Sequence, residues 1–549
     1  MPLVSGADRV VRSLVQAGVK YLFSLSGNHI MPIYDSALDA GLQIVHTRHE
    51  GAAVHMADAW GRLTGAPGIA LLTGGPGHAN GVGALHTALA SESPLVMLSG
   101  HAPLREIGKG SFQEMRQADM AAPSVKASWT AQSTAGIGDD IARAMRIATS
   151  GRPGPVHLSL PFDLLEEKSD AAGVPDLEAF GARSQPLGES DADAVLELLS
   201  RAQRPLILVG GVMSNSRAGV LPRALSEAVG VPVICMESPR GLNDPALGRL
   251  AGVVQRADLI VLLGKELDFT LRFGAAPAIA PTCDVVIVDP EAGALDRATE
   301  RIGPERIVFA AVGDSVATAE RLLQRAHSVI SKRRDWCDEV DGALKFRPPE
   351  WAALVEDGAD AVHPVKVGRA VQGLIDASPD SVLVSDGGEF GQWAQASVHA
   401  PTRVINGPGG SIGSAIPFAV AAKLARPKSQ VVAMTGDGAA GFHLLELDTA
   451  VRAGLPLVVV VGNDACWNAE HQIQLRTYGR ARAHSCELLP TRYDEVAAAL
   501  GAHGEIVAAA SKLPAALTRA AASGKPALVN VMIQRLPAPS YSPAPADAN

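Results

Sequence analysis

Cysteine is scarce in this sequence, and the few that occur form no recognisable pattern. The 549 residues include five cysteines, at positions 235, 283, 337, 466 and 486, and no two are spaced as C-x-x-C. An odd and scattered set of this kind disfavours both a disulfide framework and a structural zinc site.

An excess of basic residues and long apolar runs are also lacking. Lys and Arg number 48 against 57 Asp and Glu, a net charge of −9, and no basic block of the kind that binds nucleic acid occurs. The longest apolar run, 455–461, is too short to span a bilayer, and the N-terminus lacks the apolar core of a signal peptide. We therefore expect a cytoplasmic protein with no nucleic-acid or membrane partner.

What the sequence does contain is an alternation of two kinds of segment. Short β-branched runs alternate with Ala-rich helical stretches, the pattern of parallel sheets covered by helices. At roughly 100–200 residues per domain, the length suggests about three domains. We expect an α/β fold with three doubly wound parallel-sheet domains, at 1–165, 190–326 and 360–535, joined by a linker at 166–186 and followed by a Pro-rich C-terminal tail at 536–549.

The strands of these domains are predicted from the apolar runs. One strand precedes the loop at 25–30, and the others are 69–75, 94–100, 154–161, 205–211, 232–236, 258–264, 284–289, 381–388, 430–438, 456–464 and 526–533.

The sharpest motif is GDGAAGFHLLELDTAVRAGLPLVVVVGND at 436–464. Gly436-Asp437-Gly438 ends one strand and opens a helix, where backbone N–H groups and the helix dipole suit a phosphate. Asp437 offers an oxygen ligand for Mg²⁺, and Asp464, at the end of the next strand, offers another. Taken alone, Gly-Asp-Gly would indicate a Rossmann-like turn with a helix-capping aspartate.

The whole spacing resembles the diphosphate–Mg²⁺ motif of thiamine diphosphate enzymes. The resemblance implies that Gly436, Asp437, Gly438, Ala439 and Asp464 contact the cofactor. It also implies that Asp437, Asp464 and the backbone carbonyl of Cys466 bind Mg²⁺. The family usually has asparagine at the position of Asp464, and aspartate makes the metal site more negative.

A second motif, RHEGAAVHMADAWGRLTG at 48–65, resembles another part of the same family. There a glutamate before such a helix contacts N1′ of the aminopyrimidine, and this residue corresponds to Glu50. Proton exchange between the carboxyl group and N1′ activates the cofactor. The alternative for Glu50 alone is an ordinary glutamate favoured by the helix dipole.

Other segments match the family in the same order. GGPGHAN at 74–80 resembles its Gly-Pro-Gly turn, and GPGGSIGSAIPFAVAAKLARP at 407–427 resembles the stretch that bends the cofactor. The resemblance implies that Ile412 wedges between the cofactor's rings and that the carbonyl of Gly410 accepts from N4′. It orders the domains as pyrimidine-binding, central and diphosphate-binding. It also implies sites shared between subunits, so a homodimer is the minimum and a homotetramer is expected.

Within the family, the chain is similar to benzaldehyde lyase, 2-hydroxyacyl-CoA lyase, oxalyl-CoA decarboxylase and acetolactate synthase members. His29 and Gln113 match the active-site His and Gln of benzaldehyde lyase, where a neutral imidazole could take a proton from a substrate hydroxyl. The alternative for His29 is a loop histidine bonded to backbone. Further candidates for substrate contact, each with a structural or solvated alternative, are His78, Phe112, Trp467 and Glu487.

The resemblance implies a thiamine diphosphate- and Mg²⁺-dependent carbon–carbon lyase. It would cleave a 2-hydroxyacyl-CoA or a 2-hydroxy ketone. The alternatives are an oxalyl-CoA-type 2-oxo acid decarboxylase, an acetolactate synthase-like carboligase, and a non-catalytic homologue. Glu389-Phe390 replaces the Gln-His that acetolactate synthases often have before Trp393. The central segment has no G-x-G-x-x-G after a strand, so FAD or a nicotinamide is not supported, whereas an ADP moiety, as in coenzyme A, could still bind there.

Overall fold

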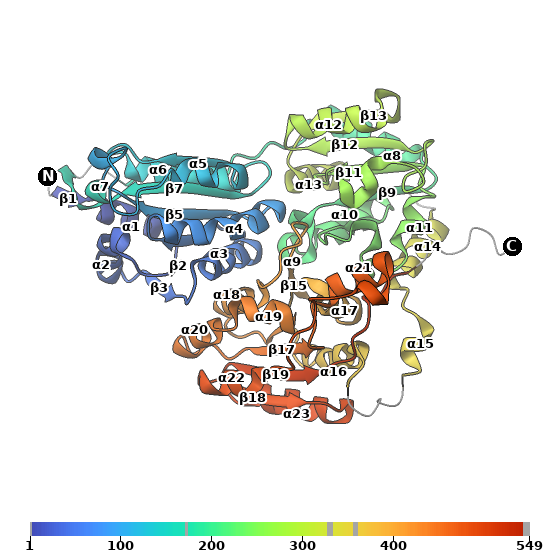
Figure 1. The fold of residues 1–549 in the computed structure, drawn as a ribbon. Helices are drawn as coiled ribbons and strands as arrows, with labels where there is room; N and C mark the ends of the chain where they lie inside the picture. The colour runs from blue at the N-terminus through green and yellow to red at the C-terminus, as the bar shows by residue number, and fades with distance from the viewer. Residues whose placement is uncertain (1–2, 171–173, 327–332, 355–360, 542–549) are drawn as a thin grey trace.

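The chain folds into three α/β domains, each built on a parallel sheet (Figure 1). This computed structural model describes residues 3–170, 174–326, 333–354 and 361–541. In Figure 1 the first domain lies beside the central domain, and the third domain lies below both. The predicted fold class is therefore confirmed. Residues 171–173 of the predicted linker and 542–549 of the predicted tail lie outside the described residues.

The first domain has a six-stranded parallel sheet in the order β3-β2-β4-β5-β7-β6. Its strands are β2 (Tyr21–Ser24), β3 (Gln43–His46), β4 (Gly68–Leu72), β5 (Leu95–His101), β6 (Ala127–Thr130) and β7 (Pro155–Pro161). Its helices are α1 (Gly6–Gln16), α2 (Met31–Ala40), α3 (Glu50–Thr64), α4 (Pro76–Ala90), α5 (Gln117–Ala121), α6 (Ile137–Thr149) and α7 (Phe162–Glu166). A short antiparallel pair, β1 (Leu3–Ser5) with β8 (Lys168–Asp170), closes this domain.

The central domain has a five-stranded parallel sheet in the order β10-β9-β11-β12-β13. Its strands are β9 (Pro205–Val209), β10 (Val233–Cys235), β11 (Leu259–Leu263), β12 (Asp284–Asp289) and β13 (Ile307–Val312). The helices are α8 (Glu189–Arg201), α9 (Asn215–Ala218), α10 (Leu221–Val229), α11 (Leu250–Val254), α12 (Ala292–Ile302), α13 (Ser315–Arg325), α14 (Arg334–Lys345) and α15 (Pro349–Ala352). Trp336 of α14 donates from Nε1 to the carbonyl oxygen of Pro205 at 2.9 Å, so chain beyond residue 326 also packs on this sheet.

The third domain has a six-stranded parallel sheet in the order β15-β14-β16-β17-β19-β18. Its strands are β14 (Val382–Ser385), β15 (Thr402–Ile405), β16 (Val431–Gly436), β17 (Val458–Asn463), β18 (His503–Val507) and β19 (Ala527–Met532). The helices are α16 (Pro364–Asp376), α17 (Gly388–Ser397), α18 (Ala415–Ala425), α19 (Asp437–His443), α20 (Glu446–Arg452), α21 (Asn468–Tyr478), α22 (Tyr493–Ala499) and α23 (Leu513–Ala522).

The first and third sheets share one topology. In each, the strands run second, first, third, fourth, sixth and fifth across the sheet, so the order reverses between the first and third strands. Loops at the carboxyl ends of strands beside such a reversal form the usual ligand crevice of an open parallel sheet. The segments around His29, Glu50, Asp437 and Asp464 all follow strands of these two sheets.

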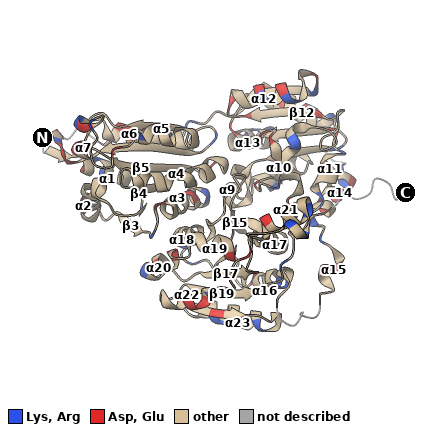
Figure 2. Cartoon of the chain, viewed as in Figure 1, with Lys and Arg blue, Asp and Glu red and all other residues tan. Residues whose placement is uncertain are grey.

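Charge and hydrophobicity are distributed as this architecture requires. The central strands are buried on both faces because helices cover them, which explains their continuous Val, Ile and Leu runs. Figure 2 shows Lys and Arg interspersed with Asp and Glu over the helices and loops of all three domains. Among the described residues, no helix is long and apolar enough to cross a membrane.

Helices α3 and α18 join the first and third domains through a continuous apolar core. Phe418 of α18 is fully buried, and the guanidinium of Arg62 from α3 lies 4.9 Å from its ring centroid. Arg62 also forms a bidentate pair with Asp58, at 2.7 and 2.6 Å, and donates to the carbonyl oxygen of Ile405 at 2.6 Å. One buried cation therefore joins a helix of the first domain to β15 of the third.

We expect Arg62→Ala to lower the free energy of unfolding by about 3–5 kcal/mol, because it leaves the buried carboxylate of Asp58 without its partner. Arg201→Ala, which removes an exposed pair with Glu197 on α8, is the matched control and should leave the urea midpoint unchanged. Equal midpoints for the two variants would show that the Arg62 pair does not stabilise the domain junction.

Candidate active site

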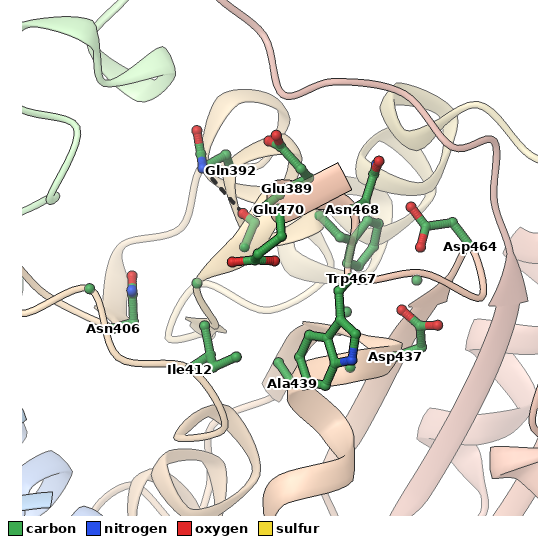
Figure 3. Close-up of a pocket in the computed structure, with 18 of the residues that line it drawn as sticks. Glu389, Gln392, Asn406, Ile412, Asp437, Ala439, Asp464, Trp467, Asn468 and Glu470 are labelled. Atoms are coloured by element: carbon green, nitrogen blue, oxygen red, sulfur yellow. Dashed lines mark hydrogen bonds between the residues drawn. The ribbon is translucent and has the colours of Figure 1, made fainter. Parts of the chain in front are cut away.

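A cavity of about 220 Å³ lies at the carboxyl ends of strands β14, β16 and β17 (Figure 3). The third domain supplies most of its lining, and the central domain adds the loop Ser238–Arg240. Nine of the residues predicted for the cofactor, the metal or the substrate line it together: Gly410, Ile412, Gly436, Asp437, Gly438, Ala439, Asp464, Cys466 and Trp467.

Asp437 and Asp464 lie on the same side of this cavity because β16 and β17 are neighbours, with Gly436 opposite Gly462 in the register. Asp437 is buried, and its Oδ2 accepts the backbone N–H of Cys466 at 3.2 Å. Burial raises the pKa of Asp437 to about 6. Burial and then the negative charge of Asp437 raise the pKa of Asp464 to about 7.

This donor set fits a small hard cation. Among the described residues, no three His, Cys, Asp or Glu side chains gather as a metal site. Two carboxylates facing one cavity, together with a backbone carbonyl at Cys466, are oxygen donors of the kind that Mg²⁺ takes while keeping waters or phosphate oxygens as its other ligands. A cation between the two carboxylates would also relieve the repulsion that raises the pKa of Asp464.

The glycine at 436 fits a ligand that approaches the backbone closely. Its φ of −72° is open to any residue, and the nearest atom to an added Cβ is the Cβ of Phe390 at 3.8 Å. Neither backbone strain nor a protein neighbour therefore requires glycine here. By contrast, a Cβ at Gly438 would lie 2.6 Å from the ring of Trp467, so the indole itself requires that glycine.

A buried carboxylate holds the opposite wall in place. Asp386, at the end of β14, accepts the N–H of Gly387 and of Gly413 on Oδ1, both at 2.9 Å. Its Oδ2 accepts the N–H of Ala415 and the hydroxyl of Thr435, both at 3.2 Å. The loop that carries Ile412 is thus tied to the ends of two strands, and Figure 3 shows the Ile412 side chain facing the cavity.

Sequence reasoning missed several polar residues of the cavity: Arg240, Glu389, Gln392, Asn406, Asn468 and Glu470. Gln392 and Glu389 lie in the first turns of α17, after the strand β14 that was predicted, so a search of the residues after each strand would have found them. Arg240 comes from the central domain, and no local pattern in the sequence marks it.

His29 and Glu50 occupy adjacent strand ends of the first domain. His29 follows β2 and Glu50 follows β3, and the structure pairs these two strands in parallel. Glu50 is the first residue of α3 and accepts from the side chain of Asn80 at 3.1 Å. His29 is buried, its Nδ1 lies 3.4 Å from the hydroxyl of Thr73, and burial lowers its pKa, which favours the neutral imidazole.

The segment 111–115 covers His29. Phe112 stacks on the imidazole with ring centroids 6.0 Å apart, and its side chain is otherwise 69% exposed. Gln113 has a left-handed φ of 56°, and its backbone packs against the Gly75 turn, where a Cβ would lie 2.7 Å from the carbonyl oxygen of Gln113. These two residues therefore lie over the same end of the first sheet as His29.

Within one chain, Glu50 does not share a cavity with Asp437. None of the described residues that line the 220 Å³ cavity comes from the first domain. The chain thus carries two separate groups of predicted residues, one at the end of the first-domain sheet and one at the end of the third-domain sheet.

Two other predicted residues lie elsewhere. His78 is fully buried in the first domain, with Nδ1 3.0 Å from the hydroxyl of Ser99, and burial lowers its pKa to about 4. Glu487 is exposed and lies 3.8 Å from Arg535. Neither lines the cavity, although Glu487 is paired across an isolated bridge with Cys466 of the loop after β17.

A second cavity, of about 450 Å³, lies where the three domains meet. The glycine turns after β9 and β11 face it, at the reversal point of the central sheet. Three cationic side chains that line it are paired with carboxylates: Arg152 with Glu92 and with Asp289 at 2.5 Å, Arg403 with Glu237 at 2.6 Å, and Lys265 with Asp268 at 3.0 Å. Arg217, which also lines it, donates to the backbone carbonyl oxygens of Ser91 and Glu92 at 2.9 and 2.5 Å.

Comparison with known families gives matches in all three domains. The N-terminal cofactor-binding domain of thiamine pyrophosphate enzymes matches residues 4–120, the central domain 192–322, and the C-terminal cofactor-binding domain 386–531. These matches define an enzyme that binds thiamine pyrophosphate, which is another name for thiamine diphosphate. The chain belongs to the thiamine pyrophosphate enzyme family.

Relatives that match nearly the whole chain include proteins with two kinds of name. A protein named acetolactate synthase large subunit IlvG, from Mycobacterium tuberculosis, is 36% identical over 95% of this chain and 94% of its own length. A human protein named 2-hydroxyacyl-CoA lyase 2 is 31% identical over 96% of this chain and 90% of its own length. An Arabidopsis thaliana protein named 2-hydroxyacyl-CoA lyase is 28% identical over 97% and 96%, respectively.

We expect Gly436→Ala to weaken binding of thiamine diphosphate about tenfold or more while leaving the melting temperature unchanged, because its methyl group takes up space at the cavity but makes only an ordinary contact with Phe390, at 3.8 Å. Calorimetric titration and thermal unfolding measure the two effects. Gly438→Ala is the contrasting variant, since its methyl group meets Trp467 and should lower the melting temperature as well. Unchanged cofactor affinity in Gly436→Ala would mean that no ligand approaches this turn.

Proposed function

We propose that this protein is a thiamine diphosphate- and Mg²⁺-dependent carbon–carbon lyase that also runs as a carboligase. The preferred substrate class is a 2-hydroxyacyl-CoA or a 2-hydroxy ketone, which is cleaved to an aldehyde and a one-carbon or acyl product. The proposal is carried by one observation in a chain of this family: Asp437 and Asp464 line one side of a small cavity, and Ile412 lies across from them.

The residues of the cavity have distinct roles in this proposal. Mg²⁺ would be bound by Asp437, Asp464 and the carbonyl oxygen of Cys466. The backbone of Gly436, which carries no side chain, would contact the diphosphate, and Ile412 would support the rings of the cofactor. The cofactor, when bound, supplies an electron sink for negative charge that develops beside a carbonyl carbon.

The residues of the first domain handle protons. Glu50 holds a proton at a ring nitrogen of the cofactor, and its buried position beside Asn80 fixes the direction of the carboxyl group. His29 takes the proton of the substrate hydroxyl, a role that suits a buried imidazole whose pKa is lowered. Gln113 orients the substrate oxygen, and Phe112 forms an apolar wall over His29.

A complete site in this proposal requires two copies of the chain. The groups around Glu50 and Asp437 do not meet in one protomer, so the first domain of one subunit would complete the cavity of its partner. A homodimer is then the smallest active unit, and a homotetramer is the expected assembly.

The cavity at the three-domain junction suits the ADP part of a coenzyme A thioester. It lies at the reversal point of the central sheet, where such sheets bind nucleotides, and the exposed ring of Phe269 at its edge offers a surface for an adenine. A free 2-hydroxy acid or ketone would leave this cavity unused.

A second candidate is an acetolactate synthase-like carboligase or a 2-oxo acid decarboxylase. The relative that favours it is the Mycobacterium tuberculosis protein named acetolactate synthase, at 36% identity. Both candidates use the same cofactor and metal residues, and they differ in whether a substrate hydroxyl must lose a proton.

Mixing two inactive variants tests the shared site. Glu50→Gln and Asp437→Ala should each reduce turnover by orders of magnitude, because one removes the proton-handling carboxyl group and the other removes a metal ligand. Co-assembled in equal amounts, they should recover about a quarter of wild-type turnover, since half of randomly formed dimers contain one intact site. No recovery in an assembly shown to contain both variants would contradict the shared site.

The variant His29→Ala separates the two candidate reactions. It should impair release of aldehyde from a 2-hydroxyacyl-CoA about 10²–10⁴-fold, the usual contribution of general base catalysis, and spare decarboxylation of a 2-oxo acid. Aldehyde and CO₂ are measured for wild type and variant on both substrate classes. If wild-type enzyme yields CO₂ from pyruvate and no aldehyde from any 2-hydroxyacyl compound, the lyase proposal is wrong and the second candidate, a carboligase or decarboxylase, replaces it.

A further inference from the structure

Glu389 is a buried carboxyl group that the proposed mechanism does not use. It lies in the first turn of α17 and lines the same cavity as Asp437 and Ile412, although its side chain is only 7% exposed. Figure 3 places it with Glu470 on one side of the cavity, across from Ile412, with Asn468 between it and Asp464.

The two carboxyl oxygens of Glu389 have different environments. Oε2 accepts the backbone N–H of Ala538 at 3.0 Å and faces the guanidinium of Arg240 at 4.0 Å. Oε1 accepts no hydrogen bond from any residue in the described part of the chain. One oxygen is thus held by protein, and the other is left for a ligand in the cavity.

The lining of the cavity that Glu389 faces carries more negative than positive side chains. Burial raises the pKa of its carboxyl group, the charge of Glu470 on α21 acts in the same direction, and Arg240 and Arg476 oppose them. A bound diphosphate or substrate anion would add negative charge to a cavity of about 220 Å³ that already contains Asp437 and Asp464. A neutral carboxyl group avoids this repulsion and gains an O–H donor.

We propose that Glu389 binds the ligand of this cavity as a neutral acid, with its free oxygen donating an O–H hydrogen bond to an anionic oxygen of that ligand. The oxygen belongs either to the diphosphate of the cofactor or to the substrate. The inference rests on the proposed function, because it takes the cavity to be the thiamine diphosphate site. Ligand binding through Glu389 then depends on pH, because only the protonated carboxyl group can donate this hydrogen bond.

The substitution Glu389→Gln tests this directly, because the amide has the shape of the protonated acid and always carries a donor. The measurement is titration of the wild-type and variant proteins with thiamine diphosphate at saturating Mg²⁺, without substrate, from about pH 6 to 9. The ratio of wild-type to variant affinity is the quantity to follow, since ionisation of Asp437 and Asp464 affects both proteins alike.

We expect that ratio to fall about tenfold per pH unit once the pH exceeds the pKa of free Glu389, because only the wild type must then take up a proton to bind. Glu470→Gln removes an exposed carboxylate from the same cavity and is the matched control. Its affinity should fall with pH as steeply as that of the wild type because Glu389 is retained, and loss of the Glu470 charge should only move this fall to lower pH.

The same comparison made on the KM of the substrate distinguishes the two sources of the anionic oxygen. A falling ratio in the cofactor titration assigns the hydrogen bond to the diphosphate, and a falling ratio in KM alone assigns it to the substrate. A ratio that stays constant with pH in both measurements overturns the proposal for Glu389. If wild-type protein does not bind thiamine diphosphate at all, it is the proposed function that fails.

Discussion

The cavity depends on one buried carboxyl group, that of Asp386, which does not itself line the cavity. Asp386 accepts three backbone N–H groups and one hydroxyl, and these come from the turn after β14, the loop before α18 and the end of β16. Without it, the glycine turn at 387–388, the Ile412 loop and the Gly436 turn would have no common anchor. Burial raises the pKa of Asp386, and the two hydrogen bonds that each of its oxygens accepts lower it, so they offset part of the cost of burying the carboxyl group.

The same cavity is short of positive charge. Asp437, Asp464, Glu389 and Glu470 line it, whereas Arg240 is its only cationic lining residue among those that the structure describes. Burial raises the pKa of Asp437, and burial together with the negative charge of Asp437 raises that of Asp464. In the proposed function Mg²⁺ supplies the missing positive charge, and protonation of a carboxyl group is the other way to reduce the negative charge of the cavity.

The sequence predicted the interiors of the three sheets better than their edges. All the strands predicted from apolar runs exist, but β3, β6, β13, β15 and β18, which lie at sheet edges, were missed. An edge strand is covered on fewer sides, so its apolar pattern is weaker; β13 and β18 are only partly buried. Cavity residues within the 407–427 and 436–464 motifs were predicted because these motifs resemble cofactor-binding segments of the family, and each motif keeps its residues within one short stretch of chain. Arg240 and the contact between Glu389 and Ala538 could not be predicted, because they join segments far apart in the sequence.

The chain after β19 returns to the cavity that its own domain forms. Arg535 donates to the carbonyl oxygen of Asp464 at 3.0 Å, Asn468 donates to that of Leu536 at 2.9 Å, and Tyr541 packs its ring against Trp351. No motif marks this segment, and its contacts are mostly made through backbone atoms. Substitutions or length changes here can reshape the cavity while every signature residue stays the same. Enzymes of this family could therefore diverge in substrate range through a stretch of chain that motif comparison overlooks.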